Sequence, residues 1–410
     1  MKVYVGKNVP IKSWCENPEE GALDQARNLA SLPFIFKQVD LMPDTHQGYG
    51  MPIGGVIATK GVVVPNAVGV DIGCGMCAIK TSLTDISMKQ IKKIFGGSKD
   101  CQGGIRSSIP VGRNRHSKKQ DVNLMPDFNK YLKYDEPTWE DYEDKFPICA
   151  REYESALKQL GTLGSGNHFI EIQADTEDNI WIMIHSGSRN LGKQVADYYN
   201  KIAKDLNEKW FSEVPKKWDL AFLPLDSKEG RSYLREMQYC VDFALANRKL
   251  MMSNIIKIFC DLHKDLHKDF DFEPMINIAH NYASIENHFG QNVVVHRKGA
   301  TLAREGTIGI IPGSQGTASY IVKGKGNPES FMSCSHGAGR NMSRTKARAE
   351  LNLEDEQKKL NDLGILHSIR GQSDLDEASS AYKDIDVVME EQKDLVDIVT
   401  KLRPLGVIKG

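Results

Sequence analysis

The sequence predicts one integrated domain, spanning residues 1–410, that combines β-strands with helices. Runs of β-branched residues alternate with glycine-rich turns over residues 41–81 and again over 293–324, which is typical of strands joined by tight loops. A segment from about 227 to 269 instead carries apolar residues at near-helical spacing. No long repeat, low-complexity tract or linker interrupts the 410 residues, which favours a single domain over several.

Composition narrows the class of protein. Hydrophobic residues make up 40% of the chain and charged residues 26%, as in an ordinary globular protein. Lys and Arg (53) nearly balance Asp and Glu (54), so a polyanionic partner must be held by a local patch. Residues 1–14 hold no apolar signal core, and no stretch approaches the roughly 18 apolar residues of a membrane helix. We therefore expect a cytoplasmic protein without a membrane partner, whose eight cysteines are reduced.

The N-terminal part begins with a predicted strand at 2–5 and a predicted helix near 19–32. The glycine-rich stretch 48–55 lies in the strand-rich region that follows, and it loosely resembles a dinucleotide-binding fingerprint. Its spacing is wrong, and Pro52 stands where the helix of that motif should begin. A Rossmann-type nucleotide site is therefore disfavoured.

A variable polar segment follows at about 82–154. Residues 104–120 are strongly basic and residues 134–146 strongly acidic. The simpler interpretation is a solvated excursion whose charges face water. The alternative is that its cations contact phosphates, since guanidinium groups bind them bidentately. These cations are Arg106, Arg113, Arg115, Lys118 and Lys119.

The first candidate site lies in residues 66–77, an apolar, strand-like run that ends on a carboxylate and a thiol. Asp71 and Cys74 stand three residues apart, and Gly73 and Gly75 allow the backbone to turn tightly beside them. Oxygen and sulfur together suit Mn, Zn, Co or Fe better than Mg or Ca. This pattern predicts a metal site that needs imidazoles from elsewhere in the chain.

Four histidines can supply those imidazoles, because each follows or ends an apolar run beside glycine, serine or asparagine. They are His168, His185, His280 and His336. A single such histidine is more often a hydrogen-bonded core residue, but the repeated context indicates one or two metal centres. The role of His46 stays open. His263 and His267 lie four apart on a helical stretch without an intervening glutamate, which favours an exposed polar face.

Cys74 and Cys77 also form a C-x-x-C pair. Such a pair occurs in zinc knuckles and in redox proteins. No second C-x-x-C or nearby histidine completes a zinc site, and the βαβ context of a thioredoxin motif is missing. Both alternatives are therefore less favoured than a mixed-ligand metal site.

Three glycine- and serine-rich loops, at 185–192, 312–316 and 335–340, cluster backbone N–H groups as phosphate-binding loops do. Together with a metal site, they make a nucleotide or polynucleotide the leading substrate class. Four cations in or near these regions could then bind further phosphates: Arg189, Lys298, Arg340 and Arg344.

A series of motifs resembles the RtcB-type RNA ligase family from about residue 41 to residue 410. They are PDTHQGYG (43–50), GVDIGCGM (69–76), GTLGSGNHFIE (161–171), IHSGSR (184–189), HNY (280–282), PGSQG, SHGAGR and the terminal Lys-Gly. The resemblance implies an α+β fold, a compact domain with packed mixed β-sheets flanked by helices. It also implies a ligase that uses GTP and two Mn²⁺ ions to join an RNA 3′-phosphate or 2′,3′-cyclic phosphate to an RNA 5′-hydroxyl, in RNA repair or tRNA splicing.

The resemblance also implies roles for individual residues. Asp71, Cys74 and His168 match the ligands of one manganese, and Cys74, His185 and His280 match those of the second. His336 matches the nucleophile that becomes histidine-GMP, and Arg189 matches an arginine that binds an RNA phosphate. The implied guanylate pocket comprises Asn167, Glu171, His280, Asn281, Pro312, Gly313, Ser314, Gln315, Ser319, His336, Gly337, Ala338, Gly339 and Lys409.

Two departures from the family pattern and two rival functions stand beside this assignment. Asn190 replaces a frequent glycine, and the 82–154 segment is shorter than in the longer members, which bears on RNA preference.

A metal-dependent phosphoesterase would use the same ligands to activate water and would need no GTP. A noncatalytic RNA-binding paralogue would have no use for a nucleophile beside two metals.

Overall fold

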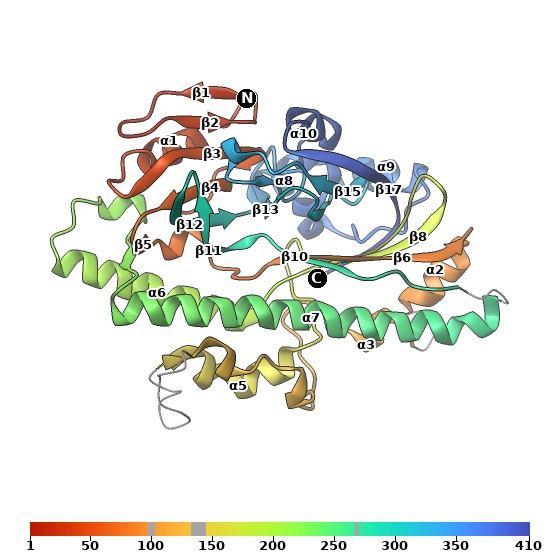
Figure 1. Ribbon diagram of the computed structural model, residues 1–410. Helices are drawn as coiled ribbons and strands as arrows, with labels where there is room; N and C mark the ends of the chain where they lie inside the picture. The colour runs from red at the N-terminus through yellow and green to blue at the C-terminus, as the bar shows by residue number, and fades with distance from the viewer. Residues whose placement is uncertain (97–102, 133–144, 267–269) are drawn as a thin grey trace.

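The computed structural model describes residues 1–96, 103–132, 145–266 and 270–410, apart from the side chains of 262–266, and is organised around two main sheets (Figure 1). The first sheet has the order β1-β2-β3-β4-β12-β11. Its strands are antiparallel to their neighbours except for the parallel β2–β3 pair. They are β1 (Lys2–Tyr4), β2 (Ile11–Ser13), β3 (Ile35–His46), β4 (Ile53–Thr59), β12 (Gln291–Lys298) and β11 (Asn281–His288).

The second sheet has the order β10-β6-β8-β7-β17-β15-β14 and brings the chain's C-terminal strand between β7 and β15. Its strands are β10 (Ile276–Ala279), β6 (Gly75–Thr84), β8 (Asn179–Ser186), β7 (Phe169–Ala174), β17 (Val396–Lys409), β15 (Ser319–Gly324) and β14 (Ile308–Ile311). Two small ribbons pair β13 (Ala300–Leu302) with β16 (Ser333–Ser335), and β5 (Val62–Val63) with β9 (Leu223–Pro224). This mixture of sheets and separate helices confirms the predicted α+β class.

The longest helices lie on one side of the sheets (Figure 1). The longest, α7 (Lys228–Leu266), runs beneath both sheets, and α5 (Pro147–Gln159) lies on its far side (Figure 1). The long helix α6 (Arg189–Lys209) packs against both α5 and α7. The other α-helices are α1 (Glu20–Leu29), α2 (Met88–Phe95), α3 (Ile105–Ser108), α8 (Arg344–Glu350), α9 (Leu353–Asp362) and α10 (Ile385–Glu391). Among the described residues, none of the helices combines the length and apolar character needed to cross a bilayer.

Most sequence-based element predictions are confirmed, with one correction. The apolar run before Asp71 is not a strand: residues 65–67 form a 3₁₀ turn, residues 68–74 form a loop, and β6 begins only at Gly75. Pro65 starts the turn, and Gly69 and Gly73 have positive φ angles of 93° and 74° that other residues rarely adopt. Residues 333–335 form strand β16, and helix α8 starts at Arg344. The acidic residues 134–144, the side chain of His263 and all of His267 lie outside the described residues.

A buried ion pair anchors the strand that leads to His336. Glu286 accepts hydrogen bonds from Arg297 Nη2 at 3.1 Å and from His288 Nε2 at 3.0 Å. Arg297 also donates from Nε to Ser333 Oγ at 2.9 Å, at the start of β16. Burial alone would raise the pKa of Glu286, but His288 and Arg297 hold it well below its usual value. This stabilisation is therefore present at neutral pH and is lost as acid protonates the carboxylate.

We expect Glu286→Ala to lower the free energy of unfolding by about 3–5 kcal/mol, because it leaves the buried Arg297 guanidinium without its counter-charge. Denaturant unfolding at neutral pH measures this loss. Glu305→Ala, which removes an exposed carboxylate, serves as the control and should change stability by less than about 0.5 kcal/mol. Equal effects of the two substitutions would contradict the prediction.

Candidate metal centre and active site

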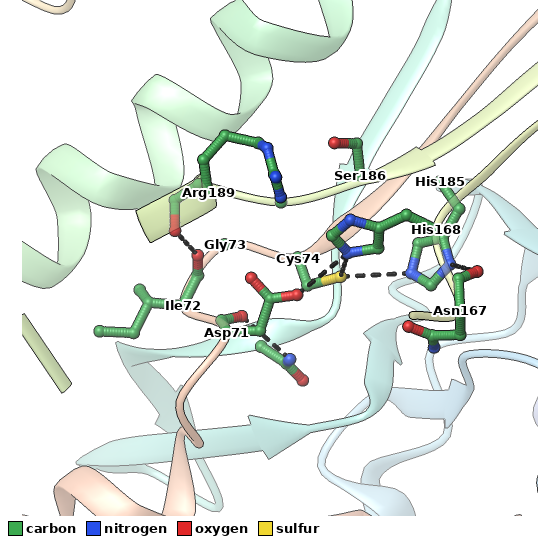
Figure 2. Close-up of polar contacts among 12 residues, drawn as sticks. Asp71, Ile72, Gly73, Cys74, Asn167, His168, His185, Ser186 and Arg189 are labelled. Carbon is green, nitrogen blue, oxygen red and sulfur yellow. Dashed lines mark hydrogen bonds and ion pairs between the residues drawn. The ribbon is translucent and has the colours of Figure 1, made fainter. Parts of the chain in front are cut away.

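Three of the predicted metal ligands meet at the adjoining ends of strands in the second sheet. Cys74 immediately precedes β6, His168 immediately precedes β7, and His185 lies near the end of β8 (Figure 2). Because β8 pairs with both other strands, the three side chains converge. The Cys74 Sγ lies 3.2 Å from His185 Nε2 and 3.4 Å from His168 Nε2, and all three residues are buried. This cluster could hold a metal ion.

The two imidazoles are oriented by backbone carbonyls. His168 Nδ1 lies 3.0 Å from the Leu163 oxygen, and His185 Nδ1 lies 3.2 Å from the Asn167 oxygen. A carbonyl oxygen only accepts hydrogen bonds, so each Nδ1 must donate a proton. Each Nε2 then turns a lone pair toward the Cys74 sulfur. Metal-bound histidines show this same outer hydrogen bond, which sets the tautomer and the ring orientation.

Asp71 and His280 extend the cluster on either side. The Asp71 Oδ2 lies 3.1 Å from His168 Nε2, and His280 Nε2 lies 3.4 Å from His185 Nε2. Burial lowers the pKa of His185 and of His280 well below the usual value, so both rings are neutral at pH 7. The Asp71 carboxylate adds an oxygen donor beside these nitrogen and sulfur atoms. Electron-pair donors therefore face one another at short range, an arrangement that fits a bound cation.

The second thiol of the C-x-x-C pair belongs to a different environment. Cys77 is fully buried in the apolar cluster that also contains Ile79 and Ile170. Burial raises the pKa of its thiol to about 12, which makes it an inert core residue. Both Cys74 and Cys77 are free cysteines.

His336 lies just beyond β16, next to the metal-type cluster, and is paired with a buried carboxylate. Its ring centroid is 4.7 Å from that of His280. Its Nδ1 lies 2.6 Å from Asp44 Oδ2, an oxygen that also accepts from the backbone N–H groups of His336 (3.1 Å) and Gly337 (3.3 Å). Burial would raise the pKa of Asp44, but His336 lowers it, so the carboxylate is ionised. His336 Nδ1 therefore donates to Asp44, and Nε2 carries the free lone pair.

Sequence reasoning missed Asp44, although it stands in the quoted PDTHQGYG motif. It lies on β3, and 292 residues separate it from His336 along the chain. The one signal in the sequence was that Asp44 is a carboxylate within a strand in which the residues on either side of it are buried. Gly339 approaches the same strand so closely that an added Cβ would lie 2.3 Å from the Asp44 carbonyl oxygen. Gly339 thus lets the SHGAGR loop pack onto β3.

A cavity opens in front of His336 and contains many of the residues assigned to the guanylate pocket. The loop 312–314, the loop 336–339, Asn167 and Lys409 line it, together with His185. Arg340 and Arg344, which the sequence predicted as phosphate-binding cations, also line it. Four further lining residues were not assigned to a site from the sequence: His46, Ile53, Phe169 and Tyr382.

Five residues of the predicted pocket do not line this cavity but are partly or fully buried near it: Glu171, His280, Asn281, Gln315 and Ser319. Two of them hold loops in place. Asn281 donates to the Asp71 carbonyl at 3.0 Å and accepts from the Gly299 N–H at 2.7 Å, and Gln315 donates to the Glu377 carbonyl at 3.0 Å. The structure therefore gives Asn281 and Gln315 supporting positions.

Glu171 and Gln173 lie side by side on β7 with unused acceptor atoms. Gln173 Nε2 donates to Glu171 Oε2 at 2.9 Å and to Ser319 Oγ at 3.0 Å. Glu171 Oε1 and Gln173 Oε1 are buried and have no hydrogen-bond partner among the described residues. Burial raises the pKa of Glu171 to about 8, although Lys409 opposes this shift. A buried acceptor without a hydrogen-bond donor lowers the stability of the folded protein.

The four cations predicted to bind phosphates differ in their surroundings. Arg189 begins α6 with a strained φ of 58°, and its side chain reaches toward the cluster (Figure 2). Arg344 lines the cavity and is partly exposed. Arg340 donates to the Asp376 carbonyl at 2.6 Å. Lys298 donates to the Tyr49 and Asn66 carbonyls at 2.5 and 3.0 Å, so in this structure it ties loops together.

Fold and site together define an α+β protein that places a buried Cys/His cluster, able to hold metal, beside a polar cavity with a carboxylate-paired histidine. The family model described as tRNA-splicing ligase RtcB matches residues 25–410. The RNA-splicing ligase RtcB of Escherichia coli K12 is 39% identical, with 98% of each chain covered. The tRNA-splicing ligases RtcB of Nanoarchaeum equitans (34%; 98% of this chain and 96% of the relative) and Thermococcus kodakarensis (35%; 96% and 92%) are also similar. The chain belongs to the RtcB family.

Proposed function

We propose that this protein is a GTP- and Mn-dependent RNA ligase, a single ligase domain over residues 1–410. It joins an RNA 3′-phosphate or 2′,3′-cyclic phosphate to an RNA 5′-hydroxyl through a histidine-GMP intermediate. The observation that carries this proposal is His336, which is paired with Asp44, faces a polar cavity and lies beside the Cys/His cluster. The relatives named as RNA-splicing and tRNA-splicing ligases support the reaction class and a role in tRNA splicing. RNA repair and a cytoplasmic location belong to the same proposal.

The metal ligands divide into two sets that share one thiolate. Asp71, Cys74 and His168 would hold one Mn²⁺, and Cys74, His185 and His280 the other. The mixed O, N and S donors and the lone pairs that face one another in the cluster fit such ions. When bound, two metal ions neutralise phosphate charge and bring attacking and leaving oxygens together.

His336 carries the covalent chemistry. Because its Nδ1–H donates to Asp44, its Nε2 is free to attack the α-phosphorus of GTP. An N–P bond forms, the bond to the β-phosphate oxygen breaks, and pyrophosphate leaves. The RNA 3′-phosphate then displaces His336 and takes up GMP, and the RNA 5′-hydroxyl displaces GMP to form the new phosphodiester. A 2′,3′-cyclic end must first be hydrolysed to the 3′-phosphate. Asp44 stabilises the charge that develops on the imidazole during the first step.

The cavity residues would hold the guanylate. Asn167, the 312–314 loop and the 336–339 loop present backbone and side-chain polar groups toward it, and Lys409 adds a positive charge. Guanine offers two adjacent N–H donors. The unused oxygens of Glu171 and Gln173 are acceptors suited to such donors, with Ser319 and Gln315 as supports. Arg189 would bind an RNA phosphate on the other side of the cluster.

Asp44→Asn should slow formation of the GMP adduct by about 10²–10⁴-fold while GTP and metal still bind. An amide can donate to His336 Nδ1 and so place the proton on Nε2, which removes the nucleophilic lone pair. The rate is measured by intact-protein mass over time. Asp40→Asn is the control, because Asp40 is a second buried carboxylate on β3 whose side chain accepts from Gln38. An unchanged rate in Asp44→Asn would contradict the orienting role.

The proposed activity is tested with two labelled RNA oligonucleotides, one ending in a 3′-phosphate and one beginning with a 5′-hydroxyl. With GTP and Mn²⁺, a joined product is expected, and it should disappear when GTP is omitted. Release of inorganic phosphate without GTP would instead support the metal-dependent phosphoesterase. The His336–Asp44 pair favours the ligase, because a phosphoesterase that activates water needs no such nucleophile.

A further inference from the structure

We propose that Arg113, Arg115 and Lys118 form a phosphate-binding ridge that guides the backbone of single-stranded RNA to the metal cluster. We call these three residues the basic ridge. The inference rests on the proposed function and deepens it, because it assigns the substrate strand a surface outside the cavity. The catalytic residues do not overlap with the ridge.

The basic ridge begins beside the metal centre. The Gly112 N–H donates to the Gly164 carbonyl at 2.6 Å, and Val111 forms a parallel β-bridge with Gly164. The Gly112 carbonyl accepts from Arg189 Nη2 at 3.4 Å. The Arg189 side chain in turn reaches toward the cluster that contains Asp71 and Cys74 (Figure 2). An RNA strand that passes Arg189 as it leaves the cluster would therefore meet the basic ridge next.

The backbone of the ridge is held in place by α5 and the turn after it. The His116 N–H donates to the Lys158 carbonyl at 2.9 Å, and the Gln120 N–H donates to the Leu157 carbonyl at 3.0 Å. His116 Nε2 also lies 3.3 Å from the Gly161 carbonyl. The three cationic side chains thus project from a fixed segment, so little backbone entropy is lost when they bind a ligand.

Among the described residues, no carboxylate pairs with the charges of the ridge. Arg113, Arg115 and Lys118 are exposed, and in the part of the chain that the structure describes none of them forms an ion pair. The nearby carboxylates are engaged elsewhere: Glu154 pairs with Lys119, and Asp121 accepts from the Asn123 N–H at 2.9 Å.

The structure also separates these three residues from the other two cations of the basic segment. Arg106 is partly buried near Arg370, and Lys119 has a carboxylate partner. Since the whole chain has a net charge of only −1, the ridge is a local feature and not part of a general positive field. Two arginines two positions apart on a fixed segment, with no ion-pair partner among the described residues, favour phosphates, which guanidinium groups bind bidentately.

The test measures how RNA affinity depends on salt. The probe is a fluorescein-labelled single-stranded RNA with a 3′-phosphate, titrated with the full-length protein and Mn²⁺ without GTP between about 50 and 200 mM NaCl. The ridge variant is Arg113→Gln/Arg115→Gln/Lys118→Gln. The matched control is Lys209→Gln/Lys217→Gln/Lys228→Gln, which removes three exposed charges around the end of α6 and the start of α7.

Each phosphate contact on a single strand contributes about −0.7 to the slope of log K against log salt. The ridge variant should therefore weaken binding and reduce the magnitude of the slope by about 2, whereas the control variant should match the wild type. GMP adduct formation is measured in parallel, and it should be unchanged in both variants. Equal slopes in the ridge variant and the wild type, or equal losses in ridge and control variants, would overturn the inference. Absence of the adduct from the wild type would instead count against the proposed function.

Discussion

His336→Ala is expected to abolish RNA ligation, with a loss of at least about 10³-fold, while leaving the metal content unchanged. The substitution removes the only nitrogen that the proposed reaction uses to form a covalent bond to GMP. His336 is not among the proposed metal ligands, and its Nδ1 is already committed to Asp44. Ligation is followed with labelled RNA, and bound manganese is followed by elemental analysis.

The control for this variant is His46→Ala. His46 lines the same cavity, and its Nδ1 lies 3.0 Å from the Asp44 backbone carbonyl, so it does not pair with the carboxylate. The His46→Ala variant should retain formation of the GMP adduct, although its affinity for GTP can change. If His336→Ala still ligates RNA at a measurable fraction of the wild-type rate, His336 is not the nucleophile.

Cys74→Ala is expected to lose both manganese ions, and with them all activity. The Cys74 sulfur lies within 3.4 Å of the Nε2 atoms of both His168 and His185, so one thiolate would serve as a ligand in both proposed sites. Removing one bridging ligand weakens both sites at once, whereas His280→Ala should affect mainly the second. The metal-to-protein ratio by elemental analysis after dialysis measures the effect.

Cys77→Ala separates this effect from a general loss of packing. Cys77 is a buried thiol three residues further along, and its side chain packs in an apolar cluster. That variant should be less stable but should keep the metal content of the wild type. A full metal complement in Cys74→Ala would rule out a bridging thiolate.

Local sequence patterns predicted the strand-end positions of the site histidines. His168, His185, His280 and His336 each lie at or next to the end of a strand, as the apolar runs and flanking small residues indicate. The same reasoning gave a wrong prediction for the residues before Asp71. Their apolar, β-branched composition is typical of a strand, but Pro65 and two glycines with positive φ turn the chain instead.

Contacts between residues far apart in the sequence could not be predicted from local patterns. Asp44 meets His336 only because the SHGAGR loop packs onto β3 across 292 residues of sequence. Lys298 was predicted to bind phosphate from its charge and its neighbours, yet its amine is buried against two carbonyls. In the basic segment, composition alone could not distinguish Arg113 and Arg115, which pair with no carboxylate among the described residues, from Lys119, which has a carboxylate partner.

The most direct test of the central claim is the intact-protein mass after incubation with GTP and Mn²⁺. The account predicts an acid-labile increase of one GMP on the wild type, located on His336 by peptide mapping. The increase should be absent with ATP and absent from His336→Ala. No adduct under these conditions, or an adduct on another residue, would contradict a ligase that works through histidine-GMP at this site.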